Sequence, residues 1–277
     1  MMNNEELRLQ KYLARCGIAS RRASEKLIQE GKITVNDKVV TKMGAKVDPS
    51  CDVVKYDGKV IKPNENDITI LLNKPVGYVS TMSDPQGRPC VADLVPVDEY
   101  PSIFPVGRLD RLTRGMLVFT TNGDLGQELL HPKNEVNKTY EVIIDGKLEE
   151  KDEAFTNLTS GVNIQSGKTA PSKLEIIEHF GFDKYLEFEN EFFKVCAEKN
   201  DSAALPNENE LINKTFTRLT IQIHEGKNRQ VRRMFETQGL SVLLLTRISI
   251  GNLKLGSLDC GKWAKLEDEE VDLLLGD

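Results

Sequence analysis

Apolar positions recur every three or four residues between residues 7 and 31, which predicts two short helices. The apolar face of the first helix carries Leu9, Tyr12, Leu13 and Cys16. We expect Gly17 to end that helix, Ser20 to cap the next and Gly31 to end it, because serine is favoured at N-caps and glycine just past C-termini.

Short alternating runs of apolar and polar residues follow these helices. The runs turn at Asn36-Asp37 and at Asp57-Gly58, pairs of the kind that favour a two-residue β-hairpin turn. Helices and hairpins together predict a small α+β domain at residues 1–63.

The polar, proline-containing stretch 62–67 is typical of a linker. A second domain is therefore expected at residues 64–277. Its apolar and alternating runs predict strands at 68–72, 116–120, 139–144 and 218–223 and helices at 124–130 and 228–238. Because strands and helices do not alternate in a βαβ rhythm, we expect an α+β fold on a mixed, largely antiparallel sheet.

Residues 178–215 carry nine acidic and four basic residues. This composition predicts a partly mobile surface insertion in the second domain.

Charge is distributed unevenly along the chain. The net charge is −6, but residues 1–63 carry 13 basic and 8 acidic residues, so the first domain is net positive. A positively charged surface for a polyanion is therefore to be sought in patches and not in the overall charge.

The five cysteines are scattered and the three histidines are far apart, which indicates neither a disulfide framework nor a metal site. The first residues lack the character of a signal peptide, and no apolar run approaches 18 residues. We expect a cytoplasmic protein with no membrane partner and no cofactor.

Basic residues mark the two N-terminal helices. Arg8, Lys11 and Arg15 share one helix face, and Arg21 and Arg22 lie in the first turn after Ser20. Cations in a first helical turn oppose the helix dipole by roughly 0.3–1 kcal/mol each, a cost that a bound phosphate would offset. The alternative is a solvated charged face.

Asp110 lies among Arg108, Arg111 and Arg114, just before an apolar run. Aspartate is ionised at neutral pH, and neighbouring cations favour that state. The pattern is typical of a site for an anionic substrate, although an aspartate after a Gly-Arg-Leu turn also fits a turn-capping role.

Three other segments carry possible chemistry. Tyr140 lies in a predicted strand, Lys74 precedes a Pro-x-Gly turn, and a cluster of cations with Lys227, Arg229 and Arg232 stands at the start of a predicted helix.

The run SGKT at residues 166–169 ends like a phosphate-binding loop, but its spacing is wrong and Pro171 would interrupt the helix that such a loop must open. We therefore expect a hairpin turn there.

Several motifs resemble a known family. Residues 8–22 (RLQKYLARCGIASRR) and 31–36 (GKITVN) resemble an S4 RNA-binding domain. Residues 106–124 (VGRLDRLTRGMLVFTTNGD), 138–142 (KTYEV), 223–235 (IHEGKNRQVRRMF) and 74–77 (KPVG) are similar to motifs of RsuA/RluB-type ribosomal RNA pseudouridine synthases.

The resemblance implies roles for individual residues. Asp110 would be the catalytic aspartate, Lys227 would pair with it, and Tyr140 would be the active-site tyrosine, either as a general base or stacked on the flipped uracil. A tyrosine acting as a base at pH 7 would give up its proton at a cost of about 4 kcal/mol. Arg108 would occupy the gap left by the flipped base. The further residues expected to bind RNA are Arg8, Lys11, Arg15, Arg21, Arg22, Lys74, Arg229 and Arg232.

The implied function is isomerisation of a specific uridine to pseudouridine in ribosomal RNA, by a monomer. Residues 83–89 (SDPQGRP), 130–132 (LHP) and 167–171 (GKTAP) are most similar to the branch that modifies large-subunit (23S) RNA. A small-subunit (16S) substrate is the near alternative. A noncatalytic S4-type ribosome-assembly factor, or a glycosidase releasing free base, are alternatives from other classes, although glycosidases usually employ two carboxylates.

Overall fold

The computed structural model describes residues 6–63, 66–194 and 208–276. Residues 64 and 65 of the predicted linker are therefore outside it. The chain divides into two compact units. The first comprises the N-terminal residues through Ile68 with the segments Pro96–Phe104 and Thr120–Asn122, and the second comprises the rest.

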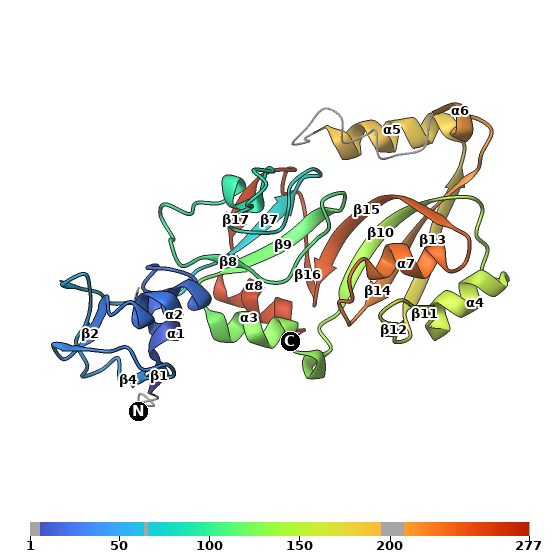
Figure 1. The fold of residues 1–277 in the computed structure, drawn as a ribbon. Helices are drawn as coiled ribbons and strands as arrows, with labels where there is room; N and C mark the ends of the chain where they lie inside the picture. The colour runs from blue at the N-terminus through green and yellow to red at the C-terminus, as the bar shows by residue number, and fades with distance from the viewer. Residues whose placement is uncertain (1–5, 64–65, 195–207, 277) are drawn as a thin grey trace. The chain divides into compact units, whose positions relative to one another are not determined.

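The N-terminal part of the first unit has the predicted helices and hairpins (Figure 1). Its elements are β1 (Leu7–Arg8), α1 (Leu9–Arg15), α2 (Arg21–Gln29), β2 (Ile33–Val35), β3 (Lys38–Val39), β4 (Lys46–Val47), β5 (Val54–Tyr56) and β6 (Lys59–Val60). The side chain of Ser20 accepts a hydrogen bond from Ala23 N (3.3 Å), as predicted for an N-cap. Leu9, Tyr12 and Leu13 lie in the core, which confirms the predicted apolar face of α1.

The two hairpins turn where the sequence predicted. Asn36, Asp37, Asp57 and Gly58 all have positive φ angles, between 44° and 78°. Two consecutive residues of this kind form the turn whose twist matches that of the flanking strands. Strands β2, β3, β5 and β6 consequently form one antiparallel sheet in the order β3-β2-β5-β6.

A nine-stranded sheet organises the second unit. Its strands run β13-β14-β10-β15-β9-β7-β17, with β16 on β15 and β8 on β9. They are β7 (Thr69–Lys74), β8 (Phe104–Pro105), β9 (Arg114–Thr120), β10 (Lys138–Asp145), β13 (Lys173–Phe180), β14 (Phe216–Ile223), β15 (Ser241–Ile250), β16 (Leu253–Lys254) and β17 (Trp263–Lys265). The pair β15–β9 is parallel, and β10, β13, β14, β15 and β16 join through antiparallel pairs. The predicted mixed, largely antiparallel α+β fold is confirmed.

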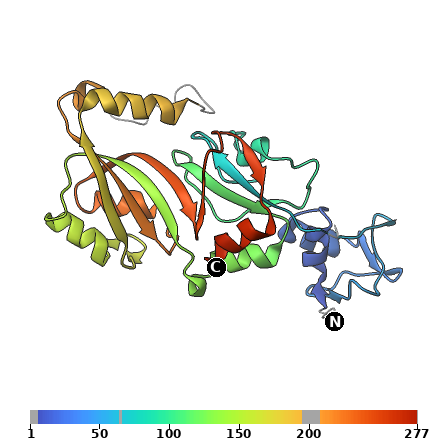
Figure 2. The ribbon, with the colours of Figure 1, turned by 180° about the vertical axis from the view of Figure 1, so that it is seen from behind.

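Short helices pack around this sheet. They are η1 (Val91–Leu94), α3 (Gly123–Leu130), η2 (Pro132–Asn134), α4 (Glu153–Ser160), α5 (Phe182–Phe193), α6 (Glu208–Leu211), α7 (Gln230–Glu236) and α8 (Asp268–Leu275). Helices α3 and α8 lie side by side in both views (Figures 1 and 2), and α7 packs on β15. No helix in the described parts of the chain is long and apolar enough to cross a membrane.

The run at residues 166–169 forms part of a hairpin, as predicted. Strands β11 (Asn163–Ile164) and β12 (Gly167–Lys168) pair antiparallel, with Ile164 opposite Gly167. Two residues therefore make the turn.

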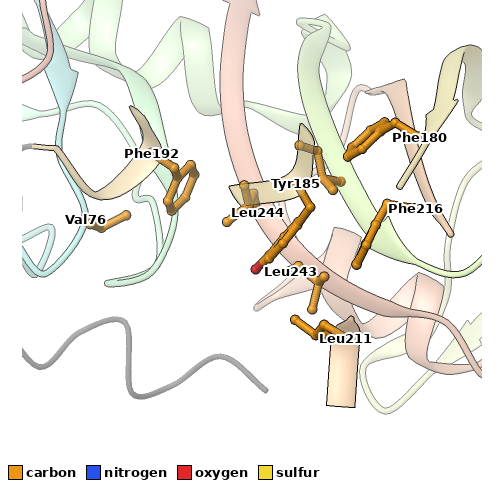
Figure 3. Close-up of a cluster of buried hydrophobic side chains, with 9 residues drawn as sticks. Val76, Phe180, Tyr185, Phe192, Leu211, Phe216, Leu243 and Leu244 are labelled. Atoms are coloured by element: carbon orange, nitrogen blue, oxygen red, sulfur yellow. The ribbon is translucent and has the colours of Figure 1, made fainter. Parts of the chain in front are cut away.

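The segment predicted as a surface insertion, residues 178–215, has one face packed into the hydrophobic core. Helix α5 contributes Tyr185 and Phe192 to the hydrophobic core (Figure 3). Tyr185 is fully buried and stacks on Phe216 of β14, with ring centroids 4.6 Å apart. The aromatic residues of this segment recur at helical spacing, a signal that its acidic composition concealed. Residues 195–207 lie outside the described residues.

Strands β9 and β15 approach each other closely at Gly115. Gly115 lies opposite Arg247 in the parallel pair and has a φ of +106°. A Cβ atom there would overlap the backbone carbonyl of Arg247. Only glycine fits at this position, for both steric and conformational reasons.

We therefore expect Gly115→Ala to lower the free energy of unfolding by roughly 3 kcal/mol or more, measured by urea denaturation. Gly167→Ala is the matched control, because Gly167 has a φ of +102° but open space around its Cα. The control retains the conformational strain alone, about 1–2 kcal/mol. Equal losses in the two variants would contradict the steric explanation.

Candidate active site

A cavity of about 600 Å³ lies within the second unit. Its walls come from the loop between β8 and β9, from β10 and β15, and from the loop before α7. Asp110, Tyr140 and Lys227, the three residues predicted to be catalytic, all line it, as do Arg108 and Arg229. The volume is typical of a ligand site.

A buried lysine holds the loop that carries Asp110. Lys74, the last residue of β7, is fully buried. Its Nζ donates to four backbone carbonyl oxygens, those of Pro75 (2.9 Å), Thr113 (3.0 Å), Asp110 (3.3 Å) and Arg111 (3.4 Å). An ammonium can leave water only where other acceptors replace its hydration. The loop therefore folds around a cation supplied by the protein itself.

Arg232 of α7 holds the same loop from another side. Its Nη2 donates to Leu112 O (2.9 Å) and its Nη1 to Val242 O on β15 (2.7 Å). Burial lowers the pKa of Arg232 to about 10. The positive charge of Arg229 also lowers this pKa, whereas the negative charge of Asp110 raises it. Asp110 and Arg232 thus attract each other across the loop.

Ser80 completes the support of the loop. Its hydroxyl donates to Leu109 O (2.8 Å) and accepts from Leu109 N (3.1 Å). Each backbone carbonyl from residue 109 to residue 113 consequently has a side-chain donor. These side-chain bonds fix the backbone of the loop, and the Asp110 side chain lines the cavity.

Lys74 and Arg232, two of the residues predicted to bind RNA, are buried. Their exposed fractions are 0% and 7%, and Lys74 Nζ and the two terminal nitrogens of Arg232 donate to protein carbonyls. A basic residue in a motif looks the same in sequence whether its charge faces solvent or the backbone of another segment.

Lys227 pairs with a different carboxylate from the predicted Asp110. Lys227 Nζ lies 2.6 Å from Glu225 Oε2 and donates to Lys168 O (2.7 Å). The other carboxylate oxygen of Glu225 accepts from Ala170 N (3.0 Å) and Gln230 Nε2 (2.6 Å). Glu225 is only two residues from Lys227, and a neighbour this close is the easier partner. Glu225 thereby joins the loop before α7 to the β11–β12 hairpin.

Tyr140 meets Arg247 at an irregularity in the sheet. The pairing of β10 with β15 shifts register between Thr139 and Tyr140, so that Tyr140 faces Arg247. Arg247 is 3% exposed, and it donates through Nε to Met116 O (2.7 Å) and through Nη1 to the Tyr140 hydroxyl (3.4 Å). This register shift is a β-bulge, a device that redirects a side chain.

Lys138 lies two residues before Tyr140 on β10, so the two side chains point to the same face of the sheet. The side chain is half-buried and lines the cavity, and Nζ donates to Val136 O (2.8 Å). Burial, together with the positive charge of Arg247, lowers the pKa of Lys138 to about 8. Within the described residues it has no carboxylate partner.

The cavity wall is strongly cationic. Asp110 is the single carboxylate among the lining residues, which also include six cations: Arg108, Arg111, Lys138, Lys227, Arg229 and Arg247. Where the structure describes the chain, no group of three or more potential ligands is arranged to hold a metal ion.

The other residues predicted to bind RNA differ in how far their side chains are exposed to solvent. Arg8, Arg21, Arg22, Arg108 and Arg229 are exposed. Lys11 and Arg15 of α1 are half-buried.

Three residues at the site were not predicted from the sequence: Lys138, Glu225 and Arg247. Lys138 was quoted within a motif, but no role was assigned to it. Arg247 carried a usable signal, because a lone charge within the otherwise apolar run of β15 must be buried or exceptional. Glu225 carried a weaker signal, its position two residues before Lys227.

Comparisons with known proteins agree with this architecture. Residues 68–237 match the profile of the RNA pseudouridylate synthase family, and residues 7–54 match that of the S4 domain. An Aquifex aeolicus protein named as an uncharacterized RNA pseudouridine synthase is 34% identical over 96% of this chain and 92% of its own length. The Bacillus subtilis protein named ribosomal large subunit pseudouridine synthase B is 37% identical over 96% of this chain and 95% of its own.

A solved structure has the same fold. It is a crystal structure of a pseudouridylate synthase, with a TM-score of 0.60 and 24% sequence identity over 97% of this chain and 99% of that one. The chain belongs to the RNA pseudouridylate synthase family, as its motifs predicted. It is an enzyme with an S4 domain near its N-terminus.

The lowered pKa of Lys138 makes folding stability depend on pH. Between about 8, its value in the folded protein, and its ordinary value of 10.5, the unfolded chain binds more protons, so the free energy of unfolding rises with pH. This gain is lost as the pH falls through 8. We expect the wild type to gain about 1–2 kcal/mol relative to Lys138→Met between pH 7 and pH 10, measured by urea denaturation.

Lys147→Met is the matched control for this comparison, because it removes an exposed lysine just beyond the other end of β10. A stability difference between wild type and Lys138→Met that does not change with pH would show that burial leaves the Lys138 charge unaffected.

Proposed function

We propose that this enzyme converts a specific uridine of large-subunit ribosomal RNA into pseudouridine. The observation that carries the proposal is the cavity in which Asp110 is the single carboxylate among six lining cations. The name of the Bacillus subtilis relative and the S4 match support the choice of RNA.

The charge of the cavity wall favours a polyanion as its occupant. Lysine and arginine side chains bind RNA mainly through phosphate oxygens, which fixes the position of the chain without reading its sequence. We assign such contacts to Arg108, Lys227 and Arg229, since each lines the cavity and keeps an exposed or partly exposed side chain. Arg108 is assigned to the gap that the flipped base leaves.

Base flipping supplies the target to the cavity. A uridine leaves its stack at a cost of a few kcal/mol, least in looped or single-stranded RNA. Asp110 then acts on the nucleotide, the C1′–N1 bond breaks, the uracil turns within the cavity, and C5 bonds to C1′. Tyr140 provides an aromatic face in the wall against which the uracil can stack.

We assign RNA binding outside the cavity to the first of two domains, residues 1–63, with the catalytic domain at residues 64–277. Arg8, Arg21 and Arg22 are exposed on its helices, beside the half-buried Lys11 and Arg15. The proposed reaction is an isomerisation that consumes no cofactor, carried out by a monomer in the cytoplasm.

Asp110→Asn tests the proposal directly, because it removes the charge with little change of shape. We expect conversion to fall by about 10⁴-fold or more. The measurement is tritium release from transcripts of 23S ribosomal RNA labelled at uridine C5, with pseudouridine identified after nuclease digestion. Asp259→Asn, at an exposed aspartate outside the cavity lining, is the matched control.

The alternatives give different results in the same assay. Release of free uracil would identify a glycosidase, and conversion of 16S transcripts alone would identify a small-subunit enzyme. Tight binding of both RNAs without conversion would favour a noncatalytic assembly factor.

A second prediction separates the two basic residues of the α7 region. Arg232→Lys keeps the charge but loses the pair of bonds to Leu112 and Val242, so we expect conversion to fall about 100-fold as Asp110 moves. Lys227→Met removes one phosphate contact. It should change conversion less than tenfold and reduce the salt dependence of RNA affinity by about one charge. Single-turnover rates and filter binding over a salt series measure both effects, and a larger rate loss in Lys227→Met would overturn the assignment.

A further inference from the structure

The proposed reaction moves a proton as well as a bond. Uridine becomes pseudouridine when C5 loses its hydrogen and N1 gains one. A half-turn of uracil about the line through C6 and N3 exchanges the positions of N1 and C5. One acid–base group beside C1′ can therefore meet N1 before the turn and C5 after it.

Few groups in the cavity wall can both give and take a proton near neutral pH. Arginine remains protonated in proteins, which excludes the four arginines that line the cavity. Lys227 is paired with Glu225 at 2.6 Å. The proposed reaction already uses Asp110 at the nucleotide and Tyr140 in stacking on the uracil. Lys138 has a backbone carbonyl, Val136 O, as its hydrogen-bond acceptor and lies on the same face of β10 as Tyr140.

We propose that Lys138 is a catalytic acid–base residue of the isomerisation. This inference rests on the proposed function. The Lys138 ammonium donates a proton to N1 as the C1′–N1 bond breaks, leaving a neutral amine. After the uracil has turned and C5 has bonded to C1′, that amine takes the proton from C5. The electron pair of the C5–H bond returns to the ring, and Lys138 is an ammonium again.

The surroundings of Lys138 suit this exchange. Its pKa of about 8 lies close to neutral pH, where transfer in either direction costs little. The charged or titratable groups around the cavity are Arg247 on β15, Tyr140 on β10, Arg108, Asp110 and Arg111 before β9, and Lys227 and Arg229 before α7. Arg247 is the one whose charge acts on the Lys138 pKa, and it is fixed by its bond to Met116 O (2.7 Å).

Two substitutions separate proton transfer from charge. Lys138→Arg keeps a positive charge that cannot be given up, and Lys138→Met removes the amine altogether. We expect both to lower single-turnover conversion of C5-tritiated 23S transcripts by about 100-fold or more, while RNA affinity in Lys138→Arg stays within a few-fold of wild type. Lys147→Arg and Lys147→Met, at an exposed position, control for lost lysines.

Near-wild-type conversion by Lys138→Arg would overturn the proposal, because a fixed charge would then suffice.

The wild type supplies a test that needs no variant. Its single-turnover rate at saturating enzyme should fall as the pH rises through about 8, and a rate that is constant or rises from pH 7 to 9.5 would overturn the proposal. If the wild type makes pseudouridine in neither 23S nor 16S RNA, the proposed function itself fails. Failure of Lys138 alone leaves wild-type conversion intact.

Discussion

The buried ammonium of Lys74 is the interaction on which the site depends. The loop before β9 turns five consecutive backbone carbonyls, those of residues 109–113, toward side-chain donors, and Lys74 serves three of them. A buried carbonyl without a donor would cost about 1–3 kcal/mol, so these side-chain donors stabilise this conformation of the loop. The conformation of the loop that carries Asp110 thus depends on a side chain from the end of β7.

Lysine and arginine side chains have two separate roles in the second unit. Lys74 and Arg232 are buried and satisfy backbone carbonyls, whereas Arg108 and Arg229 are exposed at the cavity. Lys138 is intermediate, since it is half-buried beside the like charge of Arg247. Two like charges close together in a partly buried site lower the free energy of unfolding. Active sites often retain such destabilising arrangements because activity requires them.

The sequence predicted those features that depend on local rules. The helices of the first unit follow from apolar spacing and from Ser20, and its hairpins follow from Asn36-Asp37 and Asp57-Gly58. The lining residues Asp110 and Tyr140 were found through motifs. Burial of Lys74 and Arg232 was not predictable, because it depends on carbonyls supplied by a loop elsewhere in the sequence. The Lys227–Glu225 pair and the packing of α5 were missed because composition and family motifs outweighed the neighbouring carboxylate and the aromatic spacing.

The position of Arg247 shows how the sheet itself creates the chemistry. In β15 this residue takes part in two pairings: the parallel pair with β9, where Gly115 permits close approach, and the bulged antiparallel pair with β10. Without the bulge, the register that aligns Lys138 with Ile250 would bring a different residue opposite Tyr140. The bulge directs a guanidinium toward the cavity face instead, where it donates to the Tyr140 hydroxyl and lowers the pKa of Lys138. The extra residue in β15 therefore brings Arg247, which is bonded to the backbone of β9, next to Tyr140 and Lys138 of β10.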